Sequence, residues 1–156
     1  MEEAFNKTRA EVEEFFAACI HDIFTNVPAR EGAAQTLRSL ADRGCSIHLI
    51  THRDERHRQV TEDWLRRHGF VYDSLTMCST GTGYSKKEAC LELGVQFFVD
   101  DKLENAQEVA ASGIYTLLFF ASHNAQRPND LPLVKNWTEV SEHIEFFLNQ
   151  RQRQAR

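Results

Sequence analysis

The first 44 residues carry a hydrophobic pattern that predicts helices and no strand. Apolar residues recur at helical spacing as far as about residue 24, in the order Phe5, Val12, Phe15, Phe16, Cys19, Ile20 and Phe24. Pro28 closes this segment, and we expect a second helix from Glu31 to Arg43, with Gly44 as its C-terminal stop. Two helices are therefore expected before any strand.

From residue 45 onward, short β-rich runs alternate with amphipathic helices. The expected strands are 45–50, 75–78, 95–99 and 114–120, and helices are expected from Asp54 to Gly69, from Ser85 to Gly94, over 103–112 and from Trp137. Ser85 and Glu88 have the spacing of a capping box, which marks a helix start. This alternation is typical of βαβ crossovers. It predicts an α/β, Rossmann-like parallel sheet with helices on both faces.

Composition narrows the class of protein. The 156 residues are 42% hydrophobic and 26% charged, which is typical of one folded domain. A net charge of −5 argues against a partner that is a nucleic acid polymer, and no apolar run approaches the roughly 20 residues of a membrane span. The four cysteines form no CxxC pair, which argues against a disulfide scaffold or a zinc ribbon. The acidic start lacks signal-peptide features, so we expect a cytoplasmic protein.

Candidate chemistry gathers at the ends of two predicted strands. Thr51 follows the first strand, Asp100 and Asp101 follow the third, and Lys86 starts the helix that leads into the third. In a parallel sheet these four residues share one edge, where ligands bind in open α/β folds. A hydroxyl, an ammonium group and two carboxylates suit a phosphate with a divalent cation. Mg²⁺ is the expected ion, because it takes one or two carboxylates and phosphate oxygens.

Each of these residues also has an ordinary structural interpretation. Thr51, with Asp54 three residues later, could cap the following helix, and Asp101 could cap the helix after it. The acidic pair could be a solvated corner. Lys86 opposes the helix dipole, which a bound phosphate would explain, but an exposed lysine loses little there. Arg53 could reach the site or lie on the surface.

Other motifs are less informative. His48, His52 and His57 do not share one face of a strand, turn and helix, so a zinc site is not expected. The glycine-containing segment 79–84 is too short for a Rossmann fingerprint, and we expect a mobile loop near the site.

Two stretches resemble haloacid dehalogenase (HAD) superfamily phosphohydrolases, in particular the branch related to 5′(3′)-deoxyribonucleotidases. They are HLITHRDERHRQVTEDWLRRHGFVYDSL and SKKEACLELGVQFFVDD, and the resemblance extends over about residues 20–148. It implies that Thr51 and Lys86 are catalytic and bind phosphate, that His52 and Arg53 also contact phosphate, and that Asp100 and Asp101 hold Mg²⁺. Family spacing selects Lys86 rather than Lys87.

The resemblance also exposes a departure from the family. Members begin with an apolar strand that ends in Asp-x-Asp, whose first aspartate is the nucleophile, but only Asp22 and Asp42 precede Thr51 here. It therefore implies a helical cap remnant over 1–30, a core over 31–150 and a frayed tail over 151–156. The first, central strand is expected to be missing, between the strands that end at Thr51 and Asp100. Backbone groups on both neighbours would then lack partners.

Two functions follow, and they leave open whether this chain is an enzyme. The first is a magnesium-dependent phosphohydrolase of nucleotidase type, shortened at its N-terminus, that acts on a nucleoside monophosphate or another small phosphate ester. The alternative is an inactive HAD-like remnant that binds phosphate, a nucleotide or a protein partner. A receiver-type signalling domain ranks lower, because such domains place the acidic pair early and the lysine last. A small phosphorylated metabolite is the expected ligand, no membrane partner is expected, and a homodimer is left open.

Overall fold

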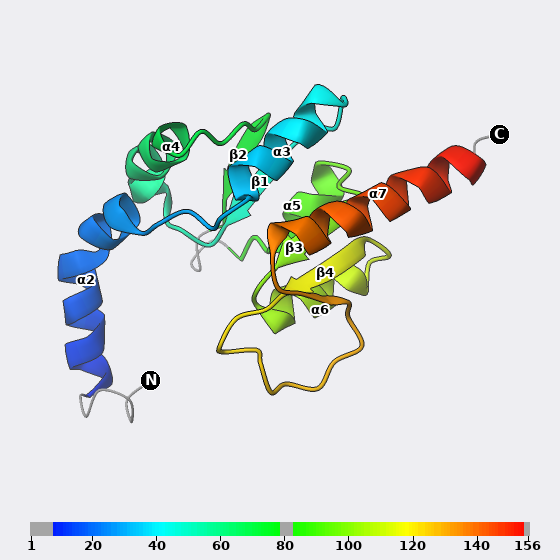
Figure 1. The fold of residues 1–156 in the computed structure, drawn as a ribbon. Coiled ribbons are helices and arrows are strands. Elements are labelled where there is room, and N and C mark those ends of the chain that lie inside the picture. The colour runs from blue at the N-terminus through cyan, green and yellow to red at the C-terminus, as the bar shows by residue number, and fades with distance from the viewer. Residues whose placement is uncertain (1–7, 79–82, 155–156) are drawn as a thin grey trace.

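The computed structural model describes residues 8–78 and 83–154, and Figure 1 shows their arrangement. The helices are α2 (Arg9–Asn26), α3 (Ala33–Asp42), the 3-10 helix η1 (Glu55–His57), α4 (Arg58–Arg67), α5 (Lys86–Glu92), α6 (Leu103–Ala110) and α7 (Trp137–Gln154). The strands are β1 (His48–Thr51), β2 (Ser74–Met77), β3 (Phe97–Asp100), β4 (Tyr115–Phe119) and β5 (Leu133–Val134). The predicted alternation of strands and helices after residue 45 is confirmed.

The strands form two parallel sheets, one of β1 and β2 and one in the order β3-β4-β5. His48 lies opposite Ser74 in the first sheet, and Phe97 lies opposite Tyr115 in the second. Every ladder between described strands is parallel, which confirms the predicted α/β, Rossmann-like architecture. Among the described strands no ladder joins β1 to β3, and the two sheets are separate groups in Figure 1. This interruption lies where the family resemblance implied a missing central strand.

Helices cover both faces of the sheets, as predicted. In β4, Leu117 and Phe119 pack into a cluster with Leu40 of α3 and Val140 of α7. Leu118, between them, packs on the other side with α6. This division follows from the alternation of side chains along a strand. Strands buried on both faces become nearly continuous apolar runs, which is how the sequence reads at 114–120.

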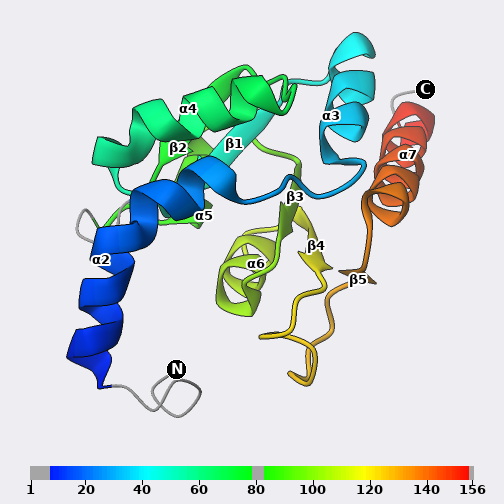
Figure 2. The ribbon, with the colours of Figure 1, turned by 60° about the vertical axis from the view of Figure 1, so that its left-hand side comes forward.

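The N-terminal helix α2 lies to one side of this core. α2 starts with a capping box between Thr8 and Glu11, a signal that the apolar spacing alone did not reveal. Its C-terminal part lies beside α4, as Figure 2 shows, and the Trp64 indole N–H donates to the carbonyl of Val27 at 2.7 Å. The division at residue 30 between a cap remnant and a core remains a prediction.

Three boundaries differ from the expectation. Thr51 is the last residue of β1 and Asp100 is the last residue of β3, whereas both were expected just beyond these strands. α7 continues to Gln154, so residues 151–154 of the expected frayed tail are helical. Arginine and glutamine favour helices, and basic side chains in the last turn suit the helix dipole. Most of the predicted loop at 79–84 lies outside the described residues. In the described part of the chain, no helix has the length and apolarity needed to cross a membrane.

Candidate functional site

The centre of the site is a buried ion pair between Lys86 and Asp100. Lys86 is the first residue of α5, which the predicted capping box of Ser85 and Glu88 starts. Its Nζ lies 2.6 Å from Asp100 Oδ2, and the two side chains are only 14% and 3% exposed. The ion pair explains a lysine in the first turn of a helix, where the dipole disfavours a cation. The alternative that Lys86 is simply exposed is wrong. Lys87, beside it, is 38% exposed.

Asp100 accepts two further hydrogen bonds. The Lys102 N–H donates to its Oδ1 at 2.8 Å, and the Asn105 side-chain amide donates to its Oδ2 at 3.3 Å. A carboxylate offers about four lone-pair positions, so these three donors leave about one. Sequence reasoning missed Asn105. The sequence feature that could have identified Asn105 is a polar residue in the first turns of a helix, next to Leu103 and Ala106, which are buried.

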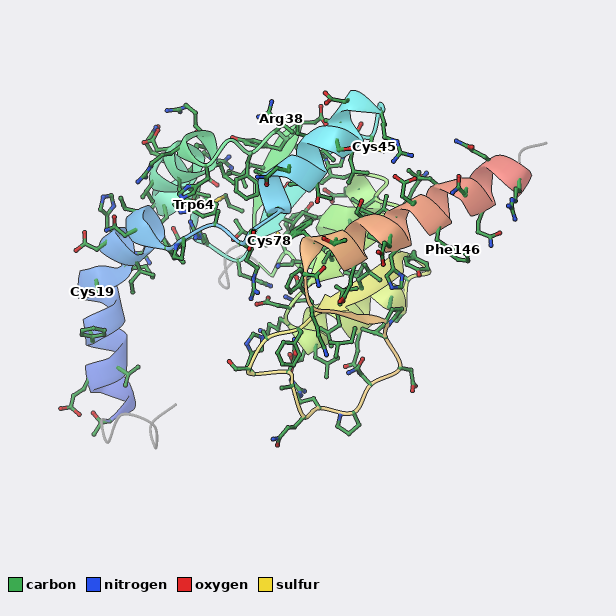
Figure 3. The ribbon with its side chains drawn as sticks, in the orientation of Figure 1. Cys19, Arg38, Cys45, Trp64, Cys78 and Phe146 are labelled. Atoms are coloured by element: carbon green, nitrogen blue, oxygen red, sulfur yellow. The ribbon has the colours of Figure 1, made fainter. Side chains whose placement is uncertain are left out.

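His52 connects the end of β1 to this network. Its Nε2 lies 3.4 Å from Asn105 Oδ1, and its Nδ1 lies 3.1 Å from the carbonyl oxygen of Cys78. Because the Asn105 amide nitrogen faces Asp100, the Asn105 oxygen is free to face His52. The residues that follow β1 and end β3 are therefore linked through one buried asparagine. Figure 3 shows Cys78, which follows β2, near the middle of the molecule. Cys45, which precedes β1, lies away from it, beyond the start of β1.

The side chains of Thr51 and Arg53 have different contacts. The Arg53 N–H donates to Thr51 Oγ1 at 3.3 Å, while Asp54 is the residue that caps η1. The alternative that Thr51 caps the next helix is therefore wrong, and within residues 8–78 and 83–154 its hydroxyl hydrogen has no acceptor. The Arg53 guanidinium turns toward α2 and α4: it donates to Thr61 Oγ1 at 3.1 Å and lies 3.8 Å from the ring centroid of Phe24. Burial lowers the pKa of Arg53.

Asp101 has an exposed carboxylate, unlike Asp100. Its side chain is 52% exposed and lies 4.0 Å from His123 Nε2. Its carbonyl oxygen accepts hydrogen bonds from His123 and from the buried Asn124. α6 has Lys102 at its N-cap position, so the alternative that Asp101 caps this helix is wrong. Asn124 was also missed, because it lies in an irregular segment.

The donor set fits a hard cation that keeps most of its own water. Asp100 has about one lone-pair position left and Asp101 has an accessible carboxylate, and Mg²⁺ is commonly held by one or two carboxylates. Among the described residues, no group of three or more histidine, cysteine, aspartate or glutamate side chains lies close enough to bind a metal by itself. The histidines of the 48–57 segment have separate partners: His48 pairs with Ser74, and the His57 ring contacts Phe24.

Comparisons with known proteins identify the family of this chain. The model of the family "5' nucleotidase, deoxy (Pyrimidine), cytosolic type C protein" matches residues 7–153. A Chlorobaculum tepidum protein named "Putative 5'(3')-deoxyribonucleotidase" is 29% identical over 139 residues, which are 85% of this chain and 63% of that protein. A Bacillus cereus protein named "Putative nucleotidase" is 25% identical over 143 residues, 91% of this chain and 75% of the relative. This chain thus spans about 63% of the length of the first relative. The match along nearly the whole chain means that it belongs to the HAD-like 5′-nucleotidase family.

Proposed function

We propose that the edge formed by Thr51, Lys86 and Asp100 binds the phosphoryl group of a nucleoside monophosphate and that the protein is a magnesium-dependent nucleotidase of the cytoplasm. The observation that carries this proposal is the Lys86–Asp100 ion pair, buried at the C-terminal end of β3. A buried ion pair often adds little net stability, because desolvation offsets the attraction. Its position at a strand end, where α/β folds bind ligands, supports a functional role.

Lys86 and Thr51 would bind the phosphoryl oxygens. The Lys86 ammonium group has three hydrogens, and Asp100 uses one of them. The Thr51 hydroxyl accepts from Arg53, and its own hydrogen has no acceptor in the part of the chain that the structure describes. Both groups can therefore donate to an anion without giving up their present contacts. Charged hydrogen bonds to phosphate are shorter and stronger than neutral ones. His52 would support this edge by holding Asn105 in place.

Mg²⁺ would be held by Asp101 and by the remaining lone pair of Asp100, and when bound it would neutralise charge on the phosphate. Thr61 and Phe24 hold the Arg53 guanidinium, so Arg53 would contact only the part of a ligand that lies toward α2.

A second candidate function is binding of a phosphate or nucleotide without turnover. Family enzymes use an aspartate nucleophile, whereas Asp100 is already paired with Lys86 and Asp22 lies within helix α2. Transfer through an aspartyl phosphate requires a carboxylate that can attack phosphorus. The chain would then bind the same ligand and release no phosphate.

Isothermal titration and a phosphate-release assay on the same protein separate the two functions. We expect saturable binding of deoxyribonucleoside monophosphates in the presence of Mg²⁺. We expect this binding to weaken about tenfold or more in Lys86→Met, since a hydrogen bond to a charged group typically contributes about 1.5–3 kcal/mol. Lys87→Met is the matched control, because Lys87 is the neighbouring residue on the same helix and is exposed.

Phosphate release that disappears in Lys86→Met and persists in Lys87→Met would support the nucleotidase. Binding without release would support the second function. If neither Mg²⁺ nor any nucleotide binds, the phosphate site proposed here is wrong.

A further inference from the structure

A pocket of 310 Å³ lies between the C-terminal part of α2 and the segment formed by η1 and α4. His21 and Thr25 of α2 form one wall, and residues within 56–67 form the other. Figure 2 shows these helices side by side. None of the three residues of the proposed phosphate edge lines this cavity, so it is a separate feature of the molecule. We call it the α2–α4 pocket.

The lining of the α2–α4 pocket carries an excess of positive charge. Arg56 and Arg67 line it, against a single carboxylate among the described lining residues, that of Asp63. This carboxylate is already engaged, because Arg66 lies 2.9 Å from its Oδ1 and the Gln59 amide donates to both of its oxygens. The chain as a whole has a net charge of −5. A cavity with two uncompensated guanidinium groups in such a chain favours an anionic ligand.

Both arginines have donors to spare. Arg67 donates from Nη1 to the carbonyl oxygen of Thr25 at 3.2 Å, which ties α2 to α4. Arg56 is 76% exposed, and its Nε lies 3.5 Å from Asp54 Oδ1. A guanidinium group carries five N–H donors, so most of these N–H groups meet no acceptor within residues 8–78 and 83–154. Their fork geometry matches the oxygens of a phosphate group.

Two histidines add donors from both walls. The His57 ring meets the ring of Phe24 edge to face, with centroids 5.2 Å apart, which fixes its orientation. The main-chain carbonyl of His21 accepts from the Thr25 hydroxyl, but no hydrogen-bond partner for the ring nitrogens of His21 or His57 occurs in the described part of the chain. Each ring can therefore donate to an anion in the pocket.

The helix dipole explains only one of the two arginines. Arg67 lies in the last turn of α4, where a cation is favourable. Arg56 lies in η1, just before α4 begins, where the α4 dipole disfavours a cation and favours an anion. An anion bound beside Arg56 would remove this conflict, because it would interact favourably with both the arginine and the start of the helix.

The size of the pocket and the spacing of its cations limit the ligand. Arg56 and Arg67 are the two ends of the lining segment, and a rise of 1.5 Å per residue places their backbones roughly 15 Å apart. A ligand that reaches both needs anionic groups at more than one point. The volume of 310 Å³ is at the small end of ligand pockets, which are typically roughly 300–1,000 Å³, so the ligand is compact.

We propose that the α2–α4 pocket binds a diphosphate group through donors of Arg56, Arg67, His21 and His57. Two sources share this chemistry, free pyrophosphate and the phosphate chain of a nucleoside triphosphate. Bound there, the anion connects α2 to α4 and adds to the contact that Arg67 makes with α2. This site requires neither the phosphate edge nor a metal ion.

The experiment measures pyrophosphate binding to the full chain by isothermal titration calorimetry, in EDTA and without added metal. We expect saturable binding that weakens at least about fivefold in Arg56→Gln and in Arg67→Gln, because each loses a charged hydrogen bond. Arg153→Gln is the matched control: it removes the same charge from an exposed position of α7, which lies on the opposite side of the molecule from α2 in Figure 1. Its binding should be unchanged.

A variant of opposite sign separates charge from folding. Asp63→Asn removes the one carboxylate among the described lining residues, so it should tighten pyrophosphate binding by at least about twofold. General damage to α4 would weaken binding instead. Titration with ATP distinguishes the two sources. Tighter binding of ATP assigns the site to a nucleotide's phosphate chain, and equal or tighter binding of pyrophosphate assigns it to the free anion.

NMR of the histidine side chains locates the anion in the wild-type protein, so this measurement needs no variant. Pyrophosphate should shift the ring signals of His21 and His57 and leave those of His52, which lies beside Asn105 at the other site. Shifts confined to His52, or loss of binding in Lys86→Met, would place pyrophosphate at the phosphate edge and overturn the proposal. Equal weakening in Arg56→Gln and Arg153→Gln would mean diffuse attraction, and absence of saturable binding would mean that the pocket takes no diphosphate.

Discussion

Replacing Lys86 by methionine tests the buried ion pair on which the site depends. The two charged atoms lie 2.6 Å apart, and the side chains are 14% and 3% exposed. Methionine has a similar length and shape but no charge, so the change leaves the Asp100 carboxylate buried without its cation. Removing one partner of a buried pair typically costs about 3–5 kcal/mol. We expect a value near the lower end, about 3 kcal/mol, because Asn105 and the Lys102 N–H still donate to Asp100.

Urea unfolding monitored by circular dichroism gives the free energy of unfolding for this test. Lys87→Met, on the same helix but 38% exposed and 3.8 Å from Glu108, should change stability by less than about 0.5 kcal/mol. The double variant Lys86→Met with Asp100→Asn removes both charges. It should be more stable than the sum of the single effects predicts, with a coupling of about 0.5–3 kcal/mol.

The reasoning is refuted if Lys86→Met and Lys87→Met lose the same small amount of stability. That result would mean that Asp100 is solvated in solution and that the ion pair does not organise the site.

Three further outcomes follow from named contacts. Asn124→Ala should cost about 1–3 kcal/mol in urea unfolding, because Asn124 is 3% exposed and its amide donates to two main-chain carbonyl groups; an unchanged midpoint would contradict this. The hydrogen bond from the Ser85 N–H lowers the pKa of Glu88 below its usual 4.5. The stability that this hydrogen bond contributes is therefore present above about pH 4.5 and is lost as the pH falls through the lowered pKa. Glu88→Gln should therefore reduce the loss of stability between neutral and acid pH, which thermal melts at several pH values can measure. Burial raises the pKa of the Cys90 thiol to about 11 and also raises that of Cys78, so neither thiol should react with a disulfide reagent at pH 8 until urea unfolds the chain.

Short-range features of the fold could be predicted because their causes lie within a few residues. The capping box at Ser85 and Glu88 starts α5 where the sequence indicated, since both partners belong to the same turn. The apolar runs at β3 and β4 could be identified because strands buried on both faces carry few polar residues. β5 could not be identified, because a strand of two residues has no period to detect.

The contacts of the site could not be predicted, because they join residues that are distant in sequence. Asn105 bonds Asp100 and lies beside His52, which is 53 positions away, and no local pattern indicates that pairing. Arg53 was left open between the site and the surface, and its guanidinium instead contacts Phe24 of α2 and Thr61 of α4. Such orientations depend on which helices pack together, and local spacing carries no information about that.

The sequence by itself determined the order of elements, the placement of Thr51 and Asp100 near the ends of parallel strands and that of Lys86 at the start of a helix, because the hydrophobic period and the capping signal are local properties. Only the tertiary structure decided that Lys86 and Asp100 form a buried pair and that Asn105 links this pair to His52. Both depend on the distance between segments that packing brings together, and burial makes both energetically important, because water no longer competes for the charges or for the polar groups.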